Sequence, residues 1–174
     1  MNKLNATQGS LLGFLHDGPK TGWDLLQQVE GVLDRFWNIT SSHVYRELRV
    51  LETRGLVKAG APGSRERRPF TITAAGRKVF RGWIAQPPGP EQIRFPLLVT
   101  LWFARHLEPE VLAGFLESSR QDHQHRLALY REVEGSLASD DDRLPVIRFG
   151  LAYEQSIVDW LQETASRPTP PPRG

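Results

Sequence analysis

The spacing of apolar residues predicts a helix between Thr40 and Gly55. Apolar residues recur in this stretch at positions i, i+4 and i+7, which places their side chains on one face of a helix. They are Val44, Leu48 and Leu51. Thr40 or Ser41 can cap the start of the helix with a hydroxyl oxygen, and Gly55 can adopt the left-handed conformation that ends one.

The opposite side of this helix is polar and basic. It carries Ser42, Arg46, Arg49 and Thr53, while Glu47 and Glu52 fall on the flanks. Two guanidinium groups beside small hydroxyls suit the recognition helix of a helix-turn-helix, which meets base edges in the major groove. An ordinary solvated basic face is the alternative, and the helix alone favours neither.

Two further helices are expected before it, over about 7–16 and 22–33, capped by Thr7 and Thr21, after a short arm at 1–6. The second has its apolar positions at Trp23, Leu26, Val29 and Leu33, with Leu25 and Val32 alongside. The connector that follows holds Phe36 and Trp37, which are expected to fill the gap between helices. Three short helices cannot each bury a face alone, so we expect them to pack as a triangle.

A β-hairpin is predicted directly after these helices. Apolar, strand-forming runs at 56–59 and 69–72 flank a turn-rich loop at 60–68. The loop carries three arginines placed to meet phosphates, Arg65, Arg67 and Arg68. The alternative is a solvated tip, although three arginines in four residues would repel one another without an anionic partner. Thr73 then caps a helix over about 74–85 with apolar residues Val79, Phe80, Trp83 and Ile84.

The second half of the chain is predicted to be helical throughout. A Pro-rich linker at 86–90 precedes helices at about 95–107, 109–134 and 145–165. The last helix has one apolar face, Ile147, Leu151, Val158 and Leu161, and a second, aromatic face, Phe149, Tyr153 and Trp160. Because two apolar faces need two partners, the aromatic face is expected to contact another subunit.

The expected fold is therefore mainly α. Residues 1–88 form a winged helix-turn-helix domain with a three-helix core and a two-stranded wing, and residues 89–166 form an all-α dimerisation domain. Residues 167–174 form a Pro-rich tail that we expect to be disordered.

Charge separates the two halves. Residues 1–90 hold 13 Lys and Arg against 7 Asp and Glu, a net charge of +6, whereas residues 91–174 hold 9 against 13, a net charge of −4. A basic half joined to an acidic half indicates that only the first meets a polyanion. There is no cysteine, the longest apolar run is too short to span a bilayer, and no secretory pattern begins the chain, so a cytoplasmic location is expected.

Catalytic and metal chemistry find little support. His123 and His125 are two residues apart, so on a helix they point to different sides and are expected to be solvated. The run Asp140 to Asp142 lacks the spacing of a calcium loop. Ser41 and Ser42 have only His43 beside them. No enzyme activity, cofactor or metal is expected.

The order of several motifs resembles the PadR-like family of winged-helix transcriptional regulators. They are Leu11-Leu12-Gly13-Phe14-Leu15, Gly18-Pro19, Thr21-Gly22-Trp23, Trp37-Asn38, the run from Ser42 to Val57, the arginine wing, and Thr73-x-Ala75-Gly76. The family more usually has Tyr where this chain has Trp23. The match covers residues 7–85 closely and the helical second half in general plan. The resemblance implies a dimer that binds operator DNA, with Tyr45 and its helix at the groove.

This pattern predicts a homodimeric transcriptional regulator, most simply a repressor, bound to double-stranded DNA at a pseudo-palindromic operator. The residues expected at DNA are Ser41, Ser42, His43, Tyr45, Arg46, Arg49, Arg65, Arg67 and Arg68. Trp102 and Trp160 are candidates for a small aromatic effector site, with plain core packing as the favoured alternative. The rival function is a protein-interaction adaptor, since winged helices also serve as docking modules.

Overall fold

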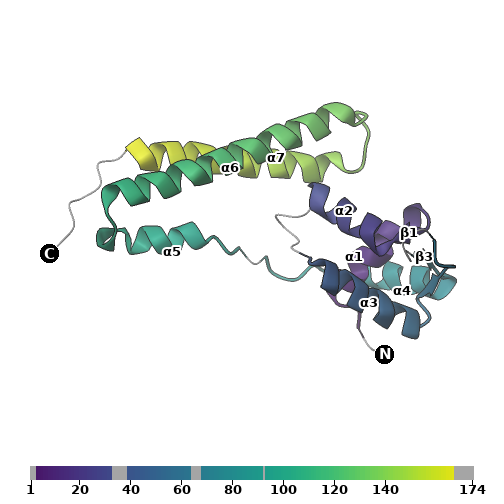
Figure 1. Ribbon diagram of the computed structural model, residues 1–174. Coiled ribbons are helices and arrows are strands. Elements are labelled where there is room, and N and C mark those ends of the chain that lie inside the picture. Colours follow the sequence, from purple (N-terminus) through teal and green to yellow (C-terminus); the bar gives the residue numbers. More distant parts are fainter. Residues whose placement is uncertain (1–2, 33–38, 64–67, 92, 167–174) are drawn as a thin grey trace. The chain divides into compact units, whose positions relative to one another are not determined.

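The computed structural model describes residues 3–32, 39–63, 68–91 and 93–166. The chain forms two compact units, Met1–Pro90 and Glu91–Gly174 (Figure 1). The first contains helices α1 (Ala6–Phe14), α2 (Gly22–Val32), α3 (Ser41–Thr53) and α4 (Ala74–Ile84), the 3-10 turn η1 (Leu15–Asp17), and strands β1 (Lys20–Thr21), β2 (Val57–Ala59) and β3 (Pro69–Ile72). The second contains α5 (Pro96–Trp102), the turn η3 (Ala104–His106), and the long helices α6 (Pro109–Ser136) and α7 (Leu144–Ser166). This arrangement confirms a mainly α fold with a winged-helix first unit.

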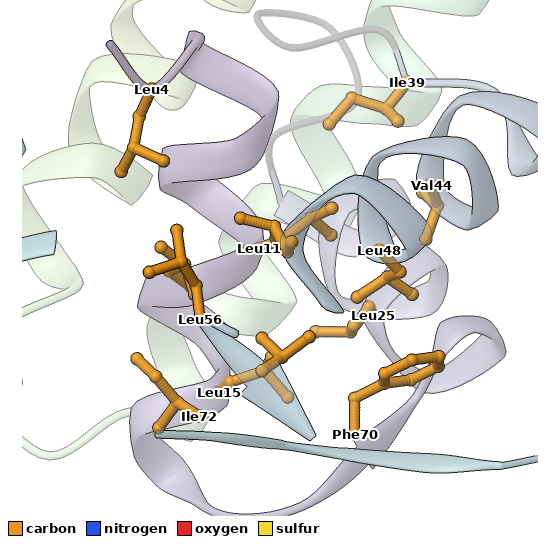
Figure 2. Close-up of a cluster of buried hydrophobic side chains, with 13 residues drawn as sticks. Leu4, Leu11, Leu15, Leu25, Ile39, Val44, Leu48, Leu56, Phe70 and Ile72 are labelled. Atoms are coloured by element: carbon orange, nitrogen blue, oxygen red, sulfur yellow. The ribbon is translucent and has the colours of Figure 1, made fainter. Parts of the chain in front are cut away.

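The core of the first unit is a leucine-rich cluster between α1, α2, α3 and the sheet (Figure 2). The apolar face predicted for α3 is confirmed, because Val44, Leu48 and Leu51 have no exposed surface. The face predicted for α2 is partly wrong: Trp23 is 44% exposed, and Leu25 is the residue with no exposed surface. Strand β1 ends at Thr21, directly before the first residue of α2. The predicted contributions of Leu33, Phe36 and Trp37 lie outside the described residues.

The start of α1 differs from the prediction. Asn5, not Thr7, is the N-cap: its side-chain oxygen accepts a hydrogen bond from the Gln8 backbone N–H at 2.7 Å. The Gln8 side chain in turn accepts from the Asn5 N–H at 3.4 Å, which completes a capping box. Leu4 is buried in the core cluster. Residues 3–5 are therefore part of the packed unit and not a free arm.

The sheet has three strands in the order β1-β3-β2, all antiparallel. The predicted hairpin is confirmed, with Val57 opposite Ile72 and Ala59 opposite Phe70. The third strand was not expected, because β1 has only two residues. It pairs with β3, with Lys20 opposite Phe70 and Thr21 opposite Pro69. Of the wing arginines, Arg65 and Arg67 lie outside the described residues.

Helix α4 is locked to the end of α3 by its cap. The Thr73 hydroxyl oxygen accepts from the Gly76 N–H at 3.0 Å, as predicted, and the hydroxyl donates to the Gly55 carbonyl oxygen at 2.8 Å. Gly55 ends the α3 segment with a φ of 67°, in the left-handed region that favours glycine. Phe80 and Trp83 pack on the core as predicted, but Ile84 is 60% exposed.

In the second unit, α6 and α7 pack side by side along most of their length (Figure 1). Leu112, Leu116 and Leu161 form a small core against which Leu101 and Trp160 pack. Helix α5 is shorter than predicted and gives way after Trp102 to the turn η3. Leu107 and Glu108 are extended, the conformation favoured ahead of a proline, so the preceding helix cannot run into α6.

The middle of α6 also departs from expectation. His123 is 1% exposed, so the prediction that it is solvated is wrong, whereas His125 is exposed as predicted. The imidazole Nδ1 of His123 donates to the carboxylate of Glu154, on α7, at 2.5 Å, and Arg126 Nε lies 3.3 Å from both carboxylate oxygens. Burial would raise the pKa of Glu154, but the His123 and Arg126 contacts outweigh it and hold that pKa below its ordinary value.

No helix within the described ranges is long and apolar enough to cross a membrane.

Candidate nucleic-acid interface

Helix α3 presents one continuous exposed face at its N-terminal end. Thr40 caps it, with its hydroxyl oxygen accepting from the His43 N–H at 3.4 Å. All six residues expected at DNA on this helix are exposed: Ser41, Ser42, His43, Tyr45, Arg46 and Arg49. The helix therefore has the orientation that base readout requires, because its apolar stripe is buried and its basic stripe faces solvent.

Tyr45 is anchored at one edge of this face. Its ring lies so close to Gly22, the first residue of α2, that a Cβ there would fall 2.5 Å from the ring. The side chain is nevertheless 42% exposed. Tyr45 is therefore packed along its ring while part of its surface remains open, which suits a contact to the sugar–phosphate backbone.

Arg46 is held by an acid that the sequence pattern placed only on the flank of the helix. Its Nε and Nη2 atoms both donate to the Oε1 oxygen of Glu47 at 3.1 Å, while 62% of the arginine side chain stays exposed. Glu47 is buried. Desolvation favours its neutral form, but hydrogen bonds from Gln8, Arg46 and Asn5 lower its pKa below the ordinary value, so the carboxylate is ionised near neutral pH.

Glu47 was missed because its partners are distant in the sequence. Its second oxygen, Oε2, accepts from Gln8 Nε2 at 2.8 Å and from Asn5 Nδ2 at 3.3 Å, both at the start of α1. Arg54, at the end of α3, donates to the Gln8 side-chain oxygen at 3.0 Å. The only local signal was an acid beside an arginine on a helix that otherwise showed a basic face.

The wing contributes one described arginine. Arg68 is exposed and lies immediately before β3. Because β3 is the central strand and is paired on both sides, the base of the wing is rigidly attached to the helical core.

The two tryptophans considered for an effector site differ in their exposure and in their contacts. Trp102 is 81% exposed at the end of α5, whereas Trp160 packs on the leucine core and meets Phe95 edge to face, with ring centroids 5.9 Å apart. Trp160 therefore packs against the core of the second unit. Phe149 is 57% exposed and stacks on Tyr153 at 6.4 Å. No group of side chains suited to a metal ion is found in the described part of the chain.

A three-helix core, a β-hairpin wing and an exposed basic α3 define the first unit as a winged-helix domain. A family model described as "Transcriptional regulator PadR-like family" matches residues 11–82, and one described as "Virulence activator alpha C-term" matches residues 93–167. Over residues 11–82, the chain therefore has the domain of the PadR-like family of transcriptional regulators.

The sequence is similar to those of known transcriptional regulators over nearly its whole length. It is 25% identical to the probable transcriptional regulator Rv1176c of Mycobacterium tuberculosis, over 90% of this chain and 94% of that one. It is also 25% identical to the negative transcriptional regulator PadR of Bacillus subtilis, over 88% and 92%. Bacillus subtilis PadR has been solved with operator DNA (TM-score 0.76, 20% identity, covering 93% of this chain and 98% of that one) and with p-coumaric acid (TM-score 0.70, 19% identity, covering 93% and 98%). These structures share the fold of this chain.

Proposed function

We propose that the protein is a homodimeric repressor that binds a pseudo-palindromic operator through α3. The observation that carries this is the exposed N-terminal face of α3, where Arg46 and Arg49 stand beside Ser42 with the apolar stripe buried. A relative named a negative transcriptional regulator, and its structure with operator DNA, support this reading. Each subunit would offer these three residues to a major groove.

Phosphate contacts would fix the position of α3 on the duplex. Tyr45 and the arginines of the wing, Arg65, Arg67 and Arg68, are proposed for this role together with Ser41 and His43. Such contacts carry no sequence information, but they supply much of the affinity and make it dependent on salt. The net charge of +6 on residues 1–90 has the sign that this requires.

Selection of bound fragments from a random duplex library, followed by a salt titration, tests the function directly. We expect one preferred half-site sequence and a linear fall of log K with log salt, because binding releases counterions from the DNA. The protein-interaction adaptor is the competing function. A chain that enriches no sequence and binds no duplex even at low salt would favour the adaptor.

Arg46→Ala should weaken binding to the selected operator by about 1–3 kcal/mol, since an arginine fork on guanine O6 and N7 contributes that much discrimination. Preference should relax at one base pair in each half-site, and affinity for random duplex should change much less. Arg81→Ala removes an equal charge from an exposed position on α4 and is the matched control. Equal losses on operator and random duplex would make Arg46 a phosphate contact instead.

The dimer is proposed to form through the second unit. Phe149 and Tyr153 offer an aromatic surface on α7, and α5 adds the exposed side chains Leu98, Val99 and Trp102. Trp160, the third residue of the predicted aromatic face, packs with its ring on the core of the second unit. We therefore propose that residues 1–88 form the DNA-binding domain and residues 89–166 the dimerisation domain.

Phe149→Asp is expected to weaken self-association at least about tenfold, because a charge would replace a large apolar contact at the interface. Analytical ultracentrifugation over a range of protein concentrations measures the change. Gln162→Asp adds the same charge at an exposed position of the same helix and should leave association unchanged. If both variants dimerise as the parent does, the interface lies away from Phe149.

We also propose that the protein binds a small aromatic effector. Bacillus subtilis PadR has been solved with p-coumaric acid, and this chain has an exposed Trp102 in its second unit. Release of the operator on adding p-coumaric acid to the complex is the corresponding test.

A further inference from the structure

The two oxygens of the Glu47 carboxylate bind different parts of the first unit. Among the residues that the structure describes, Oε1 accepts from the guanidinium of Arg46 alone, through Nε and Nη2 at 3.1 Å each. Oε2 accepts from the amide groups of Gln8 and Asn5 at 2.8 and 3.3 Å. One buried acid therefore joins the start of α1 to the exposed arginine of α3.

The contact with Glu47 leaves the other edge of the guanidinium available. Nε and Nη2 form the side edge, whereas Nη1 and the second Nη2 proton form the end edge. Within the described residues, Nη1 of Arg46 makes no hydrogen bond, and the side chain is 62% exposed. The end edge has two parallel N–H groups, the arrangement that matches guanine O6 and N7.

Helix α1 prevents the carboxylate from turning away. Gln8 is buried, and its side-chain oxygen is itself held by Arg54 at 3.0 Å. Asn5 is fixed as the N-cap of α1. Because Gln8 is buried and Asn5 is held as the N-cap, Oε1 stays directed at Arg46, and the packing of α1 on α3 decides where that guanidinium points.

We propose that Glu47 is a positioning residue for sequence readout, which fixes the side edge of Arg46 so that its end edge is presented to a base pair. Since Glu47 acts through Arg46, this role rests on the function proposed above. Holding one arginine in place before binding avoids an ordering loss equivalent to about two- to tenfold in affinity.

Glu47→Gln in the full-length chain tests this role. The variant keeps the shape of the side chain, but it loses the charge that attracts Arg46 and brings an amide group against the amides of Gln8 and Asn5. We expect the ratio of operator to random-duplex affinity to fall about two- to tenfold, with random-duplex affinity unchanged. Glu52→Gln removes an exposed acid from the same helix and should change the ratio less than twofold.

A double-mutant cycle with Arg46→Ala distinguishes positioning from a general structural role. In the Arg46→Ala background, Glu47→Gln should change the ratio less than twofold, because the group that Glu47 orients is gone. An equal effect in both backgrounds, or an equal loss on operator and random duplex, would overturn the proposal and leave Glu47 a structural residue. A rise in operator affinity on Glu47→Gln would also overturn it, by showing that Glu47 competes with DNA for Arg46.

Arg46→Lys probes the same link without altering the buried carboxylate. Lysine keeps the charge but lacks a planar fork, so it should lower the ratio and make it insensitive to Glu47→Gln. In NMR spectra of the free protein, the Arg46 Nε–H should be protected from exchange and lose that protection in Glu47→Gln. Unchanged protection would contradict the proposal even if the variant binds DNA poorly. A parent chain that selects no operator would instead refute the function itself.

Discussion

Glu154→Ala is expected to lower the free energy of unfolding by about 3–5 kcal/mol, the usual effect of removing one partner from a buried charged cluster. Glu154 has no exposed surface, and its carboxylate accepts from the buried His123 as well as from Arg126. Alanine would remove the acceptor from both and leave a cavity between α6 and α7. Denaturant unfolding followed by circular dichroism measures the change.

Glu132→Ala is the matched control, because it removes an exposed acid from α6. We expect it to change stability by less than about 0.5 kcal/mol. A similarly small effect of Glu154→Ala would mean that the buried cluster contributes no net stability.

The contribution of Glu154 should also depend on pH. The pKa of Glu154 is lower in the folded chain than its ordinary value of 4.5, so the unfolded chain takes up the proton first as pH falls. The stabilisation is therefore fully present above about pH 4.5 and is lost as pH falls below it, through the folded pKa. The stability difference between the parent and Glu154→Gln should narrow over that acidic range and stay constant above it.

Gly76→Ala is expected to destabilise the first unit by about 2–3 kcal/mol or more, through overpacking against a rigid neighbour. A Cβ at this position would lie 2.1 Å from the Leu56 carbonyl oxygen and 2.9 Å from Ile72 Cγ1. The same Leu56 carbonyl oxygen accepts a hydrogen bond from the Thr73 N–H at 3.0 Å. It therefore cannot move without disturbing the cap of α4. Thermal unfolding of the full chain measures the loss.

Gly82→Ala on the same helix should act in the opposite direction. A Cβ there meets nothing within 4 Å, and alanine favours a helix interior over glycine by about 0.5–1 kcal/mol. Two identical changes on α4 are thus expected to differ in sign. If Gly76→Ala is tolerated as well as Gly82→Ala, then α4 can move away from the end of α3 at little energetic cost.

Helix α3 shows which features the local sequence determines. Thr40 caps it and Gly55 ends it, while Val44, Leu48 and Leu51 face the core, all as predicted. These features depend on neighbours within a few turns of one helix, so their spacing in the sequence carries the needed information. The exposure of Arg46 and Arg49 follows for the same reason, and the hairpin follows because its two strands are close in the sequence.

Contacts between distant segments were decided only by the tertiary structure. The sequence placed Glu47 on a helix flank, but its burial depends on Asn5 and Gln8, some 40 residues earlier. His123 was predicted to be solvated because it lies in a polar stretch, and it is buried because Glu154 on α7, 31 residues later, supplies a charged partner. Strand β1 likewise exists only because β3 offers it an edge. A polar side chain carries no local sign of whether a distant partner will compensate its burial, and that compensation determines whether it can enter a core.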